Sequence, residues 1–217
     1  MGAYDVRGSN TGVFMRKRIP KPSVAQMKKY LSKWETLGNY VPQENALNKL
    51  FHKIIPQNKK IEEVLIKVAT LNDFYSTNIF SIYSVAKHIH SLNIDKKLKN
   101  GDVTIVSKIQ RVCVKRKQKN FYSFASKYCS HHNSKDFPIY DSYVDRVLRY
   151  FRSVHRFYQF KNEDLKEYES FKKIILEFRK FYGLESFSLK EIDRYLWLLG
   201  KEMFPKSYGK RASSASR

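Results

Sequence analysis

Cysteine and the acidic residues are both scarce in this sequence, and each shortage narrows the possible functions. Two cysteines, Cys113 and Cys129, are too few for a disulfide-linked scaffold, a four-cysteine zinc site or a four-cysteine iron–sulfur cluster. No run of about 18 apolar residues is present, and residues 1–22 contain no apolar core of signal-peptide length. We therefore expect an intracellular, cytoplasmic protein with no membrane partner.

The shortage of acidic residues leaves a large positive charge. The chain has 42 Lys and Arg against 20 Asp and Glu, which gives a formal net charge of +22 over 217 residues. A hydrophobic share of 42% is enough for a folded core, so this is not the composition of a disordered chain. Because cations that neutralise phosphates release condensed counterions, the charge favours a nucleic-acid partner. A solvated basic surface without a specific partner is the alternative.

Apolar residues recur at helical spacing along most of the chain, and no segment shows the sustained alternation of an exposed sheet. Ser23 is a good N-cap for the first helix, and Ser188 with Glu191 forms a capping box before the last one. Segment 103–114 is rich in β-branched residues, which are compatible with either a helix or a strand, and we predict a helix there. The expected helices span 23–37, 44–55, 59–71, 75–92, 103–114, 121–131, 141–151, 163–181 and 188–203.

These patterns predict an all-α protein, a compact domain of about eight to ten helices. The domain is expected to span residues 23–206, between a flexible basic arm at 1–22 and a disordered basic tail at 207–217. We expect a monomer.

Basic residues are concentrated in two runs, 108–119 and 146–156. In the second run the arginines follow one another at spacings of three and four, which aligns them along one side of a helix. Aromatic residues fill the segment between the runs and suit the stacking of an unpaired or extruded base. The predicted DNA contacts are Lys115, Arg116, Lys117, Lys119, Arg146 and Arg149.

Asp141 is the acidic residue that stands out in this segment. Pro138 forces an extended approach, and Asp141 then begins a helix whose apolar positions face inward. An aspartate at this place is a good N-cap, which is a sufficient structural explanation for it.

The same residues resemble the helix-hairpin-helix DNA glycosylase superfamily, with its 8-oxoguanine DNA glycosylase-like fold. In that family a Pro-Val-Asp segment begins a helix that contains an Arg-Val pair; here the segment reads Pro138-Ile139-Tyr140-Asp141, and Arg146-Val147 follow. Residues 64–89 are similar to the family's helix-turn-helix, which supplies part of the base pocket and the residue that fills the gap left by a flipped base. The resemblance implies two helical subdomains flanking a cleft, and double-stranded DNA as the partner.

The resemblance also implies that Asp141 is the catalytic carboxylate. Breaking an N-glycosidic bond leaves positive charge on the sugar, and a fixed carboxylate stabilises that charge and orients a water. The base pocket is expected to include Asn72, Tyr75, Tyr122 and Phe124. The expected activity is base excision from DNA, in repair or in defence against modified foreign DNA. The alternatives are a non-catalytic DNA-binding protein of the same fold and a helical RNA-binding protein.

Two departures from the family pattern affect this expectation. Bifunctional members carry a lysine in the hairpin upstream of the acid; the corresponding position is Ser123, with Lys119 and Lys127 four residues to either side. The sequence therefore predicts a monofunctional enzyme that uses water as its nucleophile. The family's Gly-x-Gly turn is replaced by the basic segment 115–120.

No metal or other cofactor is expected. Cys129, His131 and His132 are close in sequence, but neighbouring histidines on a helix point about 100° apart, and no second ligand pair appears at zinc spacing. The sequence has no Gly-rich phosphate loop and no His-Glu-x-x-His motif.

Overall fold

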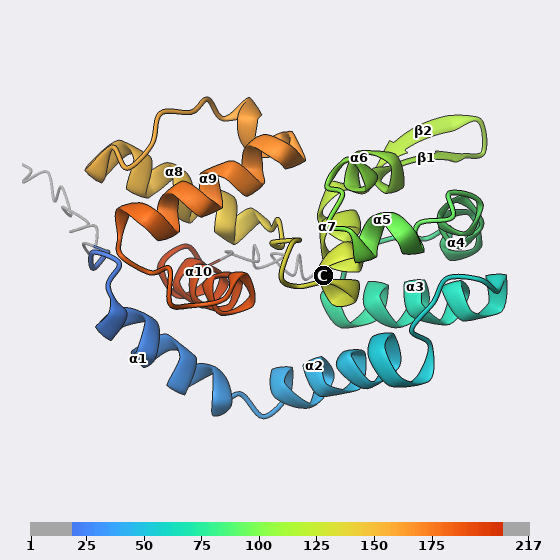
Figure 1. Cartoon of the computed structure of the whole chain (residues 1–217), viewed down its shortest axis with the longest axis horizontal. Coiled ribbons are helices and arrows are strands. Elements are labelled where there is room, and N and C mark those ends of the chain that lie inside the picture. Colours follow the sequence, from blue (N-terminus) through green and yellow to red (C-terminus); the bar gives the residue numbers. More distant parts are fainter. Residues whose placement is uncertain (1–18, 206–217) are drawn as a thin grey trace, which may run out of the picture.

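Helices make up most of residues 19–205, the part of the chain that the computed structural model describes (Figure 1). The ten α-helices of this part are α1 (Val24–Glu35), α2 (Tyr40–Lys49), α3 (Ile61–Tyr75), α4 (Ile82–Ser91), α5 (Asp95–Lys99), α6 (Thr104–Gln110), α7 (Tyr122–His132), α8 (Ser142–His155), α9 (Tyr168–Phe181) and α10 (Leu189–Met203). A π-helical segment, Leu50–Ile54, continues α2, and a 3₁₀-helix, Glu163–Lys166, precedes α9. The all-α prediction is confirmed.

The helices form two groups, and the chain crosses between them twice (Figure 1). One group contains α1, α8, α9 and α10, and the other contains α2 to α7. In the first group α10 packs against both α8 and α1; in the second, α3 packs against α4 and α7. The crossings join α1 to α2 and α7 to α8, so side chains from distant parts of the sequence meet between the groups.

The helix termini follow the sequence signals at several places. Ser23 caps α1 by accepting a hydrogen bond from the Gln26 N–H, and the Ser188–Glu191 capping box begins α10. Ile19 and Pro22, which the sequence analysis assigned to the arm, are buried, so the folded part begins before Ser23. The rest of the predicted arm and the tail at 207–217 lie outside the described residues.

The segment 103–114 differs from its prediction as one helix. Helix α6 ends at Gln110, and the chain continues as β1 (Arg111–Val114), which pairs antiparallel with β2 (Lys117–Asn120). The two turn residues, Lys115 and Arg116, have φ of 48° and 61°. Two consecutive left-handed residues match the right-handed twist of the flanking strands. The β-branched residues of this segment therefore serve a strand as well as a helix.

The break between the predicted helices 59–71 and 75–92 also lies elsewhere. Helix α3 continues to Tyr75 and ends at Ser76, which has a φ of 46°. The connection to α4 therefore spans residues 76–81. The predicted helix 163–181 is divided at Glu167, whose carboxylate caps the start of α9.

No helix among the described residues is long and apolar enough to cross a membrane. Their core is continuous and joins both helix groups.

Gly200 allows α10 to lie directly against α8. A Cβ at this position would be 2.6 Å from the Tyr143 Cβ and 3.0 Å from the Tyr143 carbonyl oxygen. Backbone atoms cannot move aside as a flexible side chain can. Gly200 therefore sets how closely the two helices approach next to Asp141.

Gly200→Ala is expected to destabilise the protein by about 1–3 kcal/mol, because overpacking outweighs the better helix propensity of alanine. Thermal unfolding followed by circular dichroism measures the effect. Gly38→Ala is the matched control, since a Cβ there has no heavy atom within 4 Å. Equal unfolding temperatures for the two variants would contradict the close approach of α8 and α10.

Candidate active site

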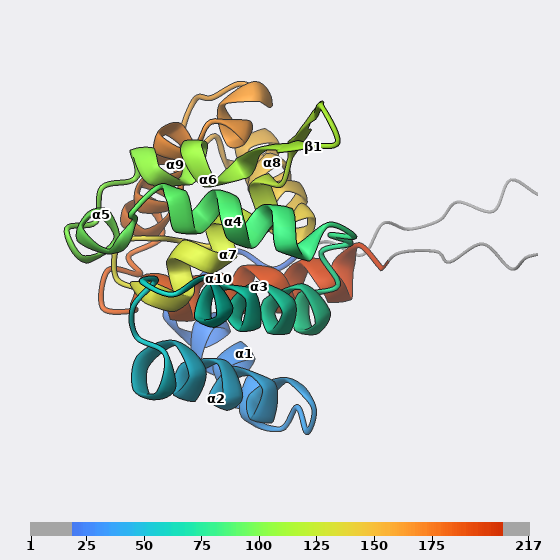
Figure 2. The same ribbon diagram turned by 90° about the vertical axis from the view of Figure 1, so that its right-hand side faces the viewer.

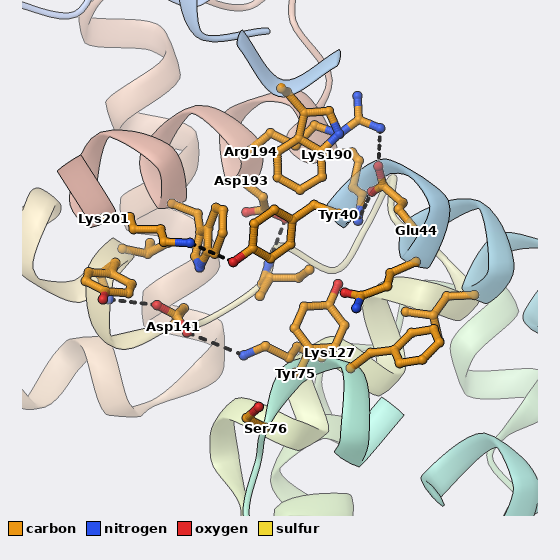
Figure 3. Close-up of a pocket in the computed structure, with 18 residues that line it drawn as sticks. Tyr40, Glu44, Tyr75, Ser76, Lys127, Asp141, Lys190, Asp193, Arg194 and Lys201 are labelled. Carbon is orange, nitrogen blue, oxygen red and sulfur yellow. Dashed lines mark hydrogen bonds and ion pairs between the residues drawn. The ribbon is translucent and has the colours of Figure 1, made fainter. Parts of the chain in front are cut away.

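A cavity of about 280 Å³ lies between the two helix groups (Figure 3). We call it the aromatic cavity, because tryptophan, tyrosine and phenylalanine side chains form much of its wall. Its lining comes from α1, α2, α3, α7, α8, α10 and the connection between α7 and α8. The cavity therefore lies where the α1–α2 and α7–α8 connections bring the two helix groups together.

A second cavity of about 430 Å³ adjoins the first. Its lining includes the end of β2, the start of α7 and the α3–α4 connection. Four residues line both cavities: Tyr75, Ser76, Lys127 and Asp141. These four residues mark the boundary between an aromatic space and a more open one.

Asp141 is positioned as the N-cap of α8. Its Oδ1 accepts a hydrogen bond of 2.8 Å from the Tyr143 N–H, and its Oδ2 is 3.7 Å from the Lys127 Nζ. The side chain keeps 20% of its surface exposed. The predicted structural role is therefore real, and the same carboxylate also faces both cavities.

Lys127 reaches Asp141 from α7 and is only 4% exposed (Figure 3). Its Nζ donates a hydrogen bond of 2.5 Å to the Ser123 Oγ and is 5.2 Å from the centroid of the Tyr75 ring. Ser123 is one helical turn before Lys127. Residues four apart lie on the same face of a helix, so Lys127 shares the face of Ser123, the position that corresponds in sequence to the family's lysine.

The aromatic wall of the cavity consists of Trp34, Tyr40 and Trp197. The Trp34 and Trp197 ring centroids are 5.9 Å apart, and Tyr40 and Trp197 are 5.0 Å apart, both pairs nearly perpendicular. The Lys201 Nζ lies 4.6 Å from the Tyr40 ring centroid and donates a hydrogen bond to the Tyr40 hydroxyl. Phe74 and Tyr75 line the cavity from α3.

A polar edge of the cavity comes from α2 and α10. The Lys190 Nζ is 2.8 Å from the Glu44 Oε1, and Arg194 pairs with the other oxygen of Glu44. Although burial opposes charge on both groups, the cations lower the pKa of Glu44, and the acidic groups Tyr75 and Glu44 raise the pKa of Lys190. Both side chains are therefore held charged.

Asp193, on the same face of α10, is 5% exposed. Burial raises its pKa to about 8, although the Ile139 N–H and the charge of Lys190 act in the opposite direction. Its Oδ2 accepts a hydrogen bond of 2.9 Å from the Ile139 N–H.

The predicted pocket residues divide into two sets. Tyr75 lines both cavities, and Tyr122 and Phe124 line the second one. Asn72 does not line either of these two cavities. Its amide instead braces the α3–α4 connection: the Oδ1 accepts from the Thr77 hydroxyl and the Ile79 N–H, and the Nδ2 donates to the Ile79 carbonyl.

The two predicted basic runs differ in how far their side chains are engaged in contacts within the protein. Residues 103–135 contain no Asp or Glu, and the hairpin cations Lys115, Arg116, Lys117 and Lys119 are exposed. None of these four makes an ion pair within residues 19–205. Lys115 and Arg116 form the hairpin turn, and Lys117 and Lys119 lie on β2.

The arginines of α8 are less uniform than the predicted stripe. Arg149 pairs with Asp145, and Arg152 donates to the Phe160 carbonyl and the Asn162 side chain. Arg156 ends the helix in a left-handed conformation. Arg146 is exposed and keeps the predicted surface position.

The histidines near Cys129 belong to buried hydrogen-bond networks. The His131 Nε2 is 2.9 Å from the Tyr75 hydroxyl, and His132 contacts Lys67 and Asn58. Burial lowers the pKa of both histidines. Within residues 19–205 no group of three or more His, Cys, Asp or Glu side chains is placed to hold a metal ion.

Sequence reasoning missed the aromatic wall and the polar edge. Trp34, Tyr40, Trp197, Lys190 and Asp193 were not among the predicted site residues. Their spacing in the sequence contains no signal that α1, α2 and α10 converge.

The comparisons with known proteins identify relatives of this chain. Residues 26–136 match the family model HI_0787_N, described as an N-terminal domain. A protein of Haemophilus influenzae (strain ATCC 51907 / DSM 11121 / KW20 / Rd), described as an uncharacterized protein, is 49% identical over 172 residues. That match covers 79% of this chain and 78% of the relative. No solved structure matches. Identity at this level over most of both chains shows that the protein belongs to the HI_0787_N family.

Proposed function

We propose that the protein is a DNA glycosylase that extrudes a damaged or modified base and cleaves its N-glycosidic bond. The observation that carries the proposal is the position of Asp141, a partly exposed carboxylate at the boundary between an aromatic cavity and a more open one. A base held in the aromatic cavity and its sugar in the second cavity would place the bond beside this carboxylate.

The chemistry of the boundary suits this reaction. Positive charge that develops on the sugar is stabilised by a fixed carboxylate, and the Tyr143 N–H keeps that carboxylate from turning away. Aromatic rings of the adjoining cavity offer faces on which an extruded base can stack.

Phe80 supplies a candidate wedge. It lies in the α3–α4 connection and is 95% exposed, which is unusual for a phenylalanine. Asn72 braces the same connection. An apolar side chain inserted between base steps unstacks them, so Phe80 would occupy the gap that the extruded base leaves.

The basic hairpin and the α3–α4 connection project from the same side of the molecule, away from α5 (Figure 2). The second cavity is lined from both elements. Duplex DNA lying across this side would meet the hairpin cations, Phe80 and Asp141 together. This arrangement supports double-stranded DNA as the partner.

The resemblance to the helix-hairpin-helix superfamily remains part of the proposal. Helices α6 and α7 pack against each other ahead of Asp141. The connection between them is a β-hairpin rather than a glycine turn, so side-chain cations would take over the phosphate contacts of the family's backbone amides.

The proposal is tested by incubating the full chain with duplexes that each carry one damaged or modified base and measuring the released base. Release from at least one duplex is expected. If no duplex releases a base while DNA still binds, the protein is the non-catalytic DNA-binding alternative.

One observation favours a second candidate, a bifunctional glycosylase and lyase. The Lys127 Nζ lies 3.7 Å from the Asp141 Oδ2, at the boundary where the sugar would sit. An unprotonated Lys127 amine would attack C1′ as the base leaves with a proton. Ring opening would give an imine, and β-elimination would then break the C3′–O bond.

Borohydride distinguishes the two candidates, because it reduces the imine to a stable amine and joins protein to DNA. With a lyase, we expect a covalent complex for the wild type and for Lys119→Gln, and none for Lys127→Gln; denaturing electrophoresis measures it. Lys119 is the matched control, since it is the other lysine displaced by four residues from Ser123. Base release without a complex would instead identify the monofunctional enzyme.

A further inference from the structure

One buried carboxylate on α8 holds two cations that come from different elements. Asp145 is 1% exposed. The Arg149 guanidinium pairs with its Oδ1, whereas its Oδ2 accepts a hydrogen bond of 2.8 Å from the Tyr140 hydroxyl and lies 3.2 Å from the Lys166 Nζ. Arg149 is one helical turn further along α8, and Lys166 ends the 3₁₀-helix that precedes α9. Asp145 therefore brings together two cations that are 17 residues apart in the sequence.

This cluster carries more positive charge than the buried carboxylate requires. One cation is enough to neutralise a carboxylate, and the Tyr140 hydroxyl already donates to this one. The second cation leaves an excess of one positive charge. Because Asp145 is buried while the Arg149 and Lys166 side chains are 42% and 60% exposed, the excess charge faces the solvent. The cluster therefore suits an anion with a single negative charge.

Both cations keep hydrogen-bond donors for such an anion. A guanidinium has five N–H donors and an ammonium has three. Within residues 19–205, Arg149 makes its ion pair with Asp145, and Lys166 contacts Asp145 and Tyr140. The Lys166 Nζ also lies 4.5 Å from the centroid of the Tyr140 ring, which holds the lysine side chain in place. Side chains that are already fixed lose little conformational entropy when a ligand binds.

The cluster adjoins the second cavity. Lys166 lines this cavity together with Asp141 and the start of α7. Asp145 is one helical turn after Asp141 on α8, which is about 6 Å along the helix axis. A sugar beside Asp141 would therefore have a flanking phosphate within reach of the cluster.

We propose that Arg149 and Lys166 form a clamp for one phosphodiester group, the phosphate that flanks the extruded nucleotide. The inference rests on the proposed function, since it places the DNA backbone at the same site. Asp145 is a positioning residue, which holds both cations and does not itself touch the DNA. The hairpin cations belong to the group of α2 to α7, so the clamp fastens the DNA to the other helix group as well.

A duplex with one tetrahydrofuran residue, a stable abasic nucleotide, tests the clamp by binding alone. The two phosphates on each side of that residue are replaced one at a time by neutral methylphosphonates, and fluorescence anisotropy measures the affinity of the full chain. One of these replacements is expected to weaken wild-type binding about tenfold. Lys166→Gln should weaken binding of the unmodified duplex by a similar factor and make the slope of log K against log salt shallower by about 1.

The two changes should not add, because they remove the two sides of one contact. In Lys166→Gln the sensitive methylphosphonate is expected to cost no more than about threefold in affinity, and Arg149→Gln should show the same reduced sensitivity. Lys28→Gln is the matched control, since it removes one exposed cation of α1 that lines neither cavity. This control should keep the tenfold effect.

Thermal unfolding establishes that the variants are folded, and each single variant leaves Asp145 with one cation. The inference is overturned if no flanking phosphate is sensitive, if the tenfold effect persists in either folded clamp variant, or if Lys28→Gln also loses it. Reduced sensitivity in both clamp variants without base release from any duplex keeps the clamp and overturns the glycosylase. Base release with full sensitivity in the clamp variants overturns the clamp alone, and a chain that binds no DNA overturns both.

Discussion

Asp141→Asn is expected to reduce base release about 10³-fold, while the affinity for DNA stays near the wild-type value. The carboxylate supplies the negative charge that stabilises the developing charge on the sugar, and an amide of the same shape does not. Single-turnover release from the best duplex measures the first quantity, and fluorescence anisotropy with the same duplex measures the second.

The Asn substitution isolates this effect because Asn is as good an N-cap as Asp. The hydrogen bond from the Tyr143 N–H is retained, so α8 should begin at the same residue and the protein should unfold at the same temperature. Asp141→Ala, in contrast, should also lose about 1 kcal/mol of stability through the missing cap. Full activity in a stable Asp141→Asn protein would remove Asp141 from the chemistry and leave it as a helix cap.

Neutralising the hairpin is expected to weaken DNA binding about 10³-fold at low salt. Each phosphate neutralised by a cation contributes about −0.9 to the slope of log K against log salt, so losing four contacts should make the slope shallower by roughly 3 to 4. The variant carries glutamine at Lys115, Arg116, Lys117 and Lys119, which are exposed and make no ion pair within residues 19–205. Salt-titrated anisotropy measures both quantities.

A control with the same change of net charge separates local contacts from the overall field of the protein. Its four glutamines replace exposed lysines on the part of the molecule around α5 and the start of α3, namely Lys60, Lys96, Lys99 and Lys135. This variant should keep a slope close to that of the wild type. If both variants lose affinity equally, the hairpin is not the DNA contact and the net charge alone accounts for binding.

The predictions from sequence succeeded where the signal is local. Ser188 and Glu191 are three residues apart, and a capping box depends only on that spacing, so the start of α10 was correct. Asp141 was identified for the same reason, since Pro138 and the apolar periodicity that follows define a helix start.

The predictions failed where two local preferences were nearly equal. The β-branched residues of 103–114 suit a strand as well as a helix, and pairing with β2 decided for the strand at Arg111. Asparagine is common in turns, yet α3 continues past Asn72. The Asn72 side chain instead accepts hydrogen bonds from the connection that follows the helix.

The sequence by itself determined that this is a basic, all-α protein with an acid at the start of α8, because charge, periodicity and capping are properties of neighbouring residues. Only the tertiary structure decided that Lys127 stands beside Asp141, and that Trp34, Tyr40 and Trp197 enclose a cavity with Asp193 in its wall. These contacts depend on two crossings of the chain between helix groups. Residues far apart in sequence meet there because the groups must bury their apolar faces against each other.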